Sequence, residues 1–291
     1  MQLDAAQLAA LSAILTHGSF DAAAAALSVT PSAISQRLRA LEDRVGTPLV
    51  LRTSPCTATQ TGARLARHAD ERALLEAELA SDLGQSSSPA RVRIAVTADS
   101  LATWVLPALA ATRGLIFDIV TDDQAHAAHW LRRGEVSAAI TDHARPVQGC
   151  TAHPMGALRY IATCSPDFQA RHFATGVSTA TLAAAPMLRF NQKDGLQEQW
   201  MRQTFGQAVS APTHHLPSSH GFVDACRLGL GWGMNPAPLV QQDLEQGRLV
   251  PLRADTALDV PLIWQVRRLV ERPLVPVTRA LRKAAQSHLQ Q

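Results

Sequence analysis

The stretch between Gly18 and Gly46 constrains the fold most, because it contains two helix starts separated by a single tight turn. Apolar residues recur at helical spacing before Gly18, which predicts a first helix. A short alanine-rich helix follows over residues 20–27. Thr30 can cap the next helix, since Pro31 fits the first helical position, where no backbone N–H is needed. Two helices joined by so tight a turn indicate a helix-turn-helix.

A short hairpin is expected next, because Gly46-Thr47-Pro48 ends the helix of residues 31–44. Leu49-Val50-Leu51 reads as one strand, and Thr57-Ala58-Thr59 can return as a second. The chain therefore begins with a predicted winged helix-turn-helix over residues 1–60.

The helix that starts at Pro31 has one apolar face and an opposite polar face suited to duplex DNA. Its free N–H groups can meet a phosphate, and short hydroxyl or amide side chains fit base edges in the major groove. Arginines reach phosphates or guanine, and the wing can touch the backbone or the minor groove. The alternative is an ordinary helical hairpin. The DNA-binding residues that we expect are Thr30, Pro31, Ser32, Ser35, Gln36, Arg37, Arg39, Arg52 and Thr53.

A long amphipathic helix is predicted after the wing, because no glycine or proline lies between Gly62 and Gly84. Leucines spaced along it form a stripe that one helix cannot bury alone, so we expect it to pair with its copy in a dimer. Residues 61–88 thus form a linker and dimerisation segment. It ends in the hinge-like composition Gln85-Ser86-Ser87-Ser88.

Strand and helix patterns alternate over residues 89–291, which predicts a mainly parallel α/β sheet. We expect two lobes: lobe one spans about 89–160 plus 266–291, and lobe two spans about 161–265. The first lobe includes an expected helix over residues 101–111. Small ligands bind in clefts between such lobes, at the carboxyl ends of strands.

Polar residues at the ends of these predicted strands are candidates for holding an amino-acid ligand. Backbone N–H groups and hydroxyls at the start of a helix can bind a carboxylate, and an aspartate can meet a cationic group. The alternative is that Asp99, Ser100, Ser219, Asp122 and Asp123 are only helix caps, and that Trp104 is a core residue. The ligand-binding candidates are Asp99, Ser100, Thr103, Trp104, Asp122, Asp123, Ser218 and Ser219.

Composition excludes several classes of protein. A hydrophobic fraction of 46% with 18% charged residues is incompatible with a disordered chain. The four cysteines lie far apart, which argues against a zinc ribbon or a disulfide framework and fits a reducing compartment. No apolar run is long enough to span a membrane, and the first residues do not resemble a secretion signal. The net charge of +3 does not by itself announce a nucleic-acid partner.

The chain resembles the LysR-type transcriptional regulators over essentially its whole length. The resemblance rests on residues 19–42, on Gly46-Thr47-Pro48-Leu49 and on Thr59-Gln60-Thr61-Gly62. Residues 99–109 and 232–236 are similar to the ArgP/LysG group, which regulates the export of lysine and arginine. This likeness implies an α/β fold with an N-terminal winged helix-turn-helix, a linker helix and a two-lobed effector-binding domain like that of periplasmic binding proteins.

The resemblance also implies a function: a cytoplasmic activator, controlled by L-lysine or L-arginine, that binds operator DNA and contacts RNA polymerase as a homodimer or homotetramer. His220 departs from the acidic residue found there in some relatives, which weakens the case for a cationic effector. A LysR-type regulator of another metabolite, or a solute-binding protein, is the alternative. We expect no enzyme activity, catalytic residue, metal, cofactor or membrane partner.

Overall fold

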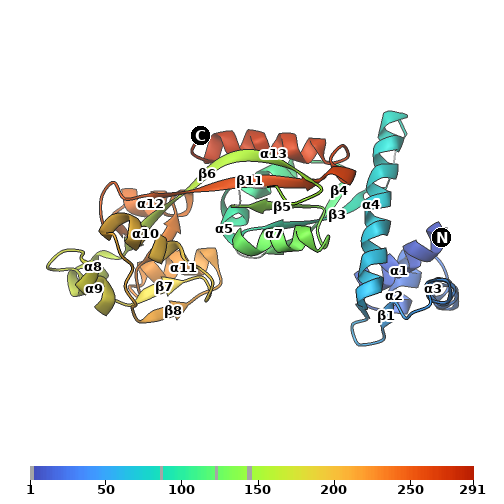
Figure 1. Cartoon of the computed structure of the whole chain (residues 1–291), viewed down its shortest axis with the longest axis horizontal. Coiled ribbons are helices and arrows are strands. Elements are labelled where there is room, and N and C mark those ends of the chain that lie inside the picture. Colours follow the sequence, from blue (N-terminus) through green and yellow to red (C-terminus); the bar gives the residue numbers. More distant parts are fainter. Residues whose placement is uncertain (1–2, 86–87, 122–123, 143–145) are drawn as a thin grey trace. The chain divides into compact units, whose positions relative to one another are not determined.

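The computed structural model describes residues 3–85, 88–121, 124–142 and 146–291. Its N-terminal part is a winged helix-turn-helix followed by a long helix, which confirms the expected fold class (Figure 1). The elements are α1 (Ala5–His17), α2 (Phe20–Ala26), α3 (Pro31–Val45), β1 (Val50–Leu51), β2 (Thr57–Ala58) and α4 (Gln60–Asp82).

Local capping sets where these helices begin and end. The hydroxyl of Ser19 accepts the backbone N–H of Ala22 at the start of α2. Gly18 and Gly46 end α1 and α3 at φ values of 74° and 78°, a left-handed conformation that glycine adopts without a steric penalty.

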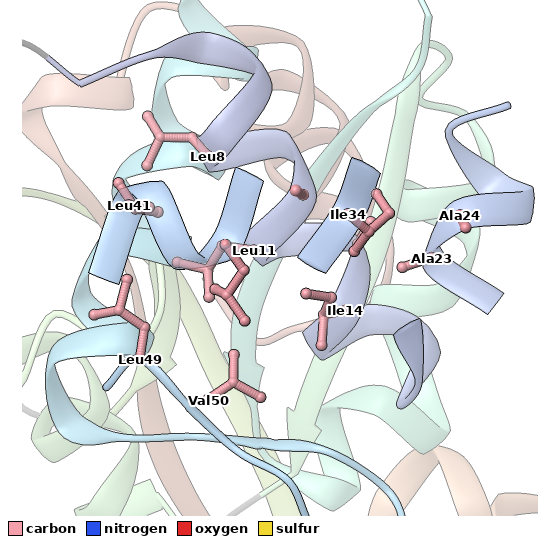
Figure 2. Close-up of a cluster of buried hydrophobic side chains, with 12 residues drawn as sticks. Leu8, Leu11, Ile14, Ala23, Ala24, Ile34, Leu41, Leu49 and Val50 are labelled. Carbon is pink, nitrogen blue, oxygen red and sulfur yellow. The ribbon is translucent and has the colours of Figure 1, made fainter. Parts of the chain in front are cut away.

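The core of this part lies between the three short helices and the wing. Figure 2 shows side chains of α1, α2, α3 and β1 converging on one cluster. Burying this apolar surface is the main favourable contribution to folding. The fully or almost fully buried aliphatic residues of the cluster are Leu8, Leu11, Ile14, Ile34, Leu38, Leu41 and Leu49.

The linker helix starts in direct contact with the wing. A Cβ atom on Gly62 would lie 1.9 Å from the carbonyl oxygen of Leu49, so only glycine fits at this point of α4. Further along the helix, three leucines stay exposed: Leu75, Leu79 and Leu83 are 36%, 59% and 64% accessible. Their spacing of four residues places them on one stripe of α4.

The C-terminal part is built on one seven-stranded sheet, in the order β10-β6-β11-β5-β3-β4 with β9 also paired to β6. A separate parallel pair, β7 and β8, joins it by a bridge from Met187 to Trp232. The strands are β3 (Ala90–Val96), β4 (Leu115–Thr121), β5 (Ala138–Thr141), β6 (Cys150–Cys164), β7 (Met187–Arg189), β8 (Thr213–His215), β9 (Gly233–Pro236), β10 (Val250–Pro251) and β11 (Leu258–Arg267).

The expectation of a mainly parallel sheet is wrong for its longest strands. β3 and β5 are parallel, but β11 is antiparallel to both β5 and β6, and β9 and β10 are antiparallel to β6. The reason is that β6 carries the chain from the first lobe to the second and β11 brings it back. Figure 1 shows these two strands running between the two groups of helices, with α13 along them.

Helices cover the sheet in both lobes. The first lobe contains α7 (Gln124–Arg132) and α13 (Val275–His288), with a short η2 (Arg268–Val270) before α13. The second lobe contains α8 (Pro166–His172), α9 (Thr179–Ala184), α10 (Leu196–Phe205), α11 (Ser219–Arg227) and α12 (Ala237–Glu245).

The helix expected over residues 101–111 is interrupted by a wider turn. It consists of α5 (Ala98–Ser100), the π-helical η1 (Leu101–Val105) and α6 (Leu106–Ala110). Pro107 has no N–H to donate to the preceding turn, which accounts for the break in the α-helical ladder.

No single helix in the described residues has the length and hydropathy of a membrane span. In this part of the chain, the sharply bent pair of α1 and α2 passes on length and composition alone.

Candidate nucleic-acid interface and ligand cavity

Helix α3 presents a polar face away from the N-terminal core. Ile34, Leu38 and Leu41 are buried, whereas Ser32 and Gln36 are exposed on the same helix. Of the other predicted DNA-binding residues on α3, Arg39 is exposed, and Ser35 and Arg37 are partly exposed. The serines and the glutamine are therefore available to an outside partner and are not part of the packing.

The predicted DNA-binding residues at the start of α3 and in the wing make different contacts within the protein. Thr30 is exposed but already uses its hydroxyl as a cap, accepting the N–H of Ala33 at 3.2 Å, and Pro31 occupies the first turn. In the wing, the Thr53 hydroxyl donates to the carbonyl oxygen of Pro55 at 2.6 Å. Arg52 is exposed, and its guanidinium lies 5.1 Å from the centre of the Phe20 ring. The wing thus offers one positioned cation.

A cavity of about 260 Å³ lies between the two lobes of the C-terminal part. The first lobe contributes the turn after β3 and the residue after β5. The second contributes the loop from β7 to α10, the start of α11 and strand β9. The lining residues are Thr97, Ala98, Asp99, Asp142, Phe190, Asn191, Lys193, Asp194, Gly195, Leu196, Gln199, Ser219, Phe222, Met234, Asn235, Pro236 and Val260.

Asp99 connects the two lobes through its carboxylate. The Ser219 hydroxyl on α11 donates to one oxygen at 2.6 Å, and the Tyr160 hydroxyl on β6 donates to the other at 2.8 Å. Burial raises the pKa of Asp99; the two hydroxyl hydrogen bonds lower it, and the charge of Asp194 raises it further. The net effect is a raised pKa, as expected for a carboxyl group in a confined, acidic cavity.

The loop between β7 and α10 is fixed by its own polar groups. The carboxylate of Asp194 accepts the backbone N–H groups of Phe190 and Leu196 and the side-chain amide of Gln197. Arg189 binds the carbonyl oxygen of Asp194 through its guanidinium. This network fixes the loop that contains the cavity-lining Lys193, before α10, and the Asp194 carboxylate has a structural role in it.

The charged groups among the described lining residues are three carboxylates and one ammonium group. These are Asp99, Asp142, Asp194 and Lys193. A ligand that suits this arrangement carries positive groups for the carboxylates and one negative group for the lysine.

Two of the residues expected to bind the ligand, Asp99 and Ser219, line this cavity, and a hydrogen bond joins them. Asp122 and Asp123 lie outside the described residues. Four others are not part of the cavity lining: Ser100, Thr103, Trp104 and Ser218.

These four residues lie outside the cavity lining because they cap or pack the helices that contain them. The backbone N–H of Ser100, which we expected to meet a carboxylate, donates to the capping hydroxyl of Thr97. The Thr103 hydroxyl donates to the carbonyl oxygen of Asp99, as side chains on helices often do. Trp104 is fully buried in the core. Ser218 caps α11 by accepting the N–H of Gly221, while its neighbour Ser219 faces the cavity.

Sequence reasoning missed Asp142, Lys193 and Asn235. Asp142 follows the end of β5 as Asp99 follows β3, so the strand-end rule could have found it. Lys193 is one of only two lysines in the chain, but nothing in the local sequence places it at the cavity. His220, the departure noted above, is exposed and is not part of the lining.

A winged helix-turn-helix with an exposed polar helix, together with a charged cavity in a two-lobed domain, defines the class of ligand-controlled DNA-binding proteins. Residues 5–63 match the family model described as "Bacterial regulatory helix-turn-helix protein, lysR family", and residues 85–290 match "LysR substrate binding domain". The chain belongs to the LysR family of bacterial regulators.

Individual relatives agree over nearly the full length. The transcriptional regulator LysG of Mycobacterium bovis is 44% identical over 286 residues, covering 98% of this chain and 94% of the relative. The regulator ArgP of Pseudomonas aeruginosa is 42% identical over 268 residues, covering 90% and 89%.

Solved structures give the same result. The crystal structure of ArgP from Mycobacterium tuberculosis has a TM-score of 0.80 at 44% identity and covers 99% of both chains. LysG from Corynebacterium glutamicum with bound effector Arg has a TM-score of 0.68 at 36% identity, covering 99% of this chain and 100% of that one. The chain is therefore an effector-controlled, DNA-binding transcriptional regulator and not an enzyme or a solute-binding protein.

Proposed function

We propose that the effector is a basic amino acid, L-lysine or L-arginine. The observation that carries this proposal is the charge pattern of the cavity. A basic amino acid has two cations and one carboxylate. Asp99 and Asp142 supply negative charge for the two cations, and Lys193 supplies positive charge for the carboxylate. The relatives named LysG and ArgP, one with bound arginine, support the same class of effector.

Calorimetry with four ligands tests this assignment. L-arginine and L-lysine should bind. L-citrulline, which keeps the shape of arginine without its charge, and agmatine, which lacks the carboxylate, should each bind about tenfold more weakly or worse. Lys193→Gln should weaken L-arginine binding but should not weaken agmatine binding, because agmatine has no carboxylate for the lysine to contact. Equal affinities for arginine and citrulline would contradict a cationic effector, and binding of neither basic amino acid would point to another metabolite.

For DNA, we propose that α3 enters the major groove and that the wing contacts the backbone. The exposed polar face of α3 supports this docking. The proposed contacts are Thr30, Pro31, Ser32, Ser35, Gln36, Arg37 and Arg39 on and before α3, with Arg52 and Thr53 from the wing. A DNA-binding domain of residues 1–60, a linker of residues 61–88 and an effector domain of residues 89–291 complete the proposed layout.

We further propose that two or four copies assemble, with α4 as the dimer contact, and that the assembly acts on RNA polymerase. The exposed leucine stripe of α4 supports the dimer. An effector that favours one arrangement of the lobes over another would change the geometry of the bound DNA. From the resemblance to the ArgP/LysG group, we propose that the target is an exporter gene for basic amino acids and that the regulator activates it. As a DNA-binding regulator, it would act in the cytoplasm.

A further inference from the structure

One lining residue of the cavity has a buried acceptor with nothing to accept. Among the described residues, several buried side-chain polar atoms lack a hydrogen-bond partner, and of these only the carbonyl oxygen Oδ1 of Asn235 belongs to a cavity-lining side chain. Asn235 is completely buried, on strand β9. A buried acceptor without a partner is costly, so such an atom at a ligand site points to a donor on the ligand.

The orientation of the Asn235 amide is fixed by its surroundings. Its Nδ2 atom donates to Thr163 Oγ1 at 2.9 Å and to Cys226 Sγ at 3.3 Å, and it lies 3.5 Å from the carbonyl oxygen of Gly233. A carbonyl oxygen can only accept, so the NH₂ group must stay on that side of the side chain. Thr163 is itself fully buried. Oδ1 is therefore the end of the amide that is left without a partner.

The neighbourhood of Asn235 favours an ammonium group as the donor. Asp99 lines the same cavity and supplies a negative charge, but its two oxygens already accept from Tyr160 and Ser219. An ammonium group has three N–H donors and can meet several separate acceptors, whereas a guanidinium prefers the paired oxygens of one carboxylate. A rigid single acceptor therefore suits the α-ammonium that lysine and arginine have in common.

We propose that Asn235 Oδ1 accepts a hydrogen bond from the α-ammonium group of the effector, beside the charge of Asp99. This assignment depends on the proposed basic amino-acid effector and adds a residue to its recognition. Asn235 would thereby make the regulator select α-amino acids over acids of the same shape that lack the amino group.

The proposal is tested by comparing two proteins, the wild type and Asn235→Leu, with two ligands that differ only in the α-amino group. The affinity of the full-length protein is measured by calorimetry for L-arginine and, by competition against it, for the des-amino analogue of L-arginine. The wild type should prefer L-arginine by about tenfold or more, because a hydrogen bond to a charged group is lost with the analogue. Asn235→Leu should weaken L-arginine binding by a similar factor and weaken the analogue much less.

The possible results separate clearly. If Asn235→Leu binds L-arginine as the wild type does, or weakens both ligands equally, the proposal is wrong. If Asn235→Leu instead loses the preference for L-arginine over L-citrulline, Asn235 contacts the side-chain end of the effector, and the proposal is also wrong. If Asn235→Leu does not fold by circular dichroism, Asn235→Ser replaces it, since serine keeps a small polar group without the carbonyl oxygen. Failure of the wild type to bind any basic amino acid would refute the proposed effector and not the role of Asn235 alone.

Discussion

Asp99 shows how one side chain can connect the architecture to the chemistry of the site. It lies in the helical turn α5 that follows β3, accepts a hydrogen bond from a hydroxyl on α11 and another from a hydroxyl on β6, and also lines the cavity. Its position follows from the rule that ligands bind at the carboxyl ends of strands. Its raised pKa follows from burial among other carboxylates.

The raised pKa of Asp99 predicts that effector affinity depends on pH. In the free protein the carboxyl group keeps its proton to a higher pH than an ordinary aspartate. A cationic effector favours the ionised form, so binding releases protons in that range and affinity rises with pH. By the same linkage, the free folded protein loses stability as the pH rises through the range, because the folded state binds more protons than the unfolded state there.

Calorimetry of L-arginine binding in buffers of different ionisation enthalpy measures this proton release. Asp99→Asn should bind L-arginine about tenfold or more weakly and should lose the pH dependence. A pH dependence that survives in Asp99→Asn would assign the titration to another group.

At the scale of elements, the N-terminal part could be predicted closely from sequence because its determinants are local. The hydroxyl caps at Ser19 and Thr30 and the glycine stop at Gly18 each act within a few residues of the boundary that they set. The apolar spacing of α3 likewise identifies its buried face without reference to the rest of the chain.

The C-terminal part could be predicted only in outline, because its arrangement depends on contacts between distant segments. Strand and helix alternation gave the α/β class, but not that β6 and β11 run antiparallel between the lobes. The partners of Asp99 are 61 and 120 residues away in sequence. Lys193 reaches the cavity through a loop whose shape depends on Asp194 and Arg189, and no local pattern reveals that placement.

Helix α3 carries a prediction about sequence-specific binding. Gln36 is exposed on the polar face and uncharged, so Gln36→Ala should reduce operator affinity by about tenfold and relax base preference while leaving the salt dependence of binding unchanged. Arg39→Gln should instead lower the steepness of the salt dependence. Gel-shift titrations at several salt concentrations measure both quantities. Gln60, an exposed glutamine at the start of α4, provides the control Gln60→Ala. An unchanged footprint and affinity in Gln36→Ala would remove Gln36 from the base-reading residues.

For the whole molecule, the proposed dimer contact and the proposed effector site use different residues. The cavity is lined entirely by residues between 97 and 260, whereas the exposed leucine stripe lies on α4. If α4 joins two copies, breaking that contact should affect DNA binding, which needs two recognition helices, far more than effector binding, which needs one cavity.

Leu79→Glu tests this separation, because it places a charge in the middle of the stripe, at a side chain that is 59% accessible in one copy. We expect a smaller assembly by analytical ultracentrifugation and operator affinity lower by about tenfold or more, since the avidity of two linked sites is lost. Affinity for L-arginine should be unchanged. Ser81→Glu adds the same charge to an exposed position two residues away, off the stripe, and should leave assembly and DNA binding intact. If Leu79→Glu keeps the mass of the wild type, α4 is not the dimer contact. If its L-arginine affinity falls together with its mass, the cavity depends on assembly, and effector binding and oligomer formation are thermodynamically linked.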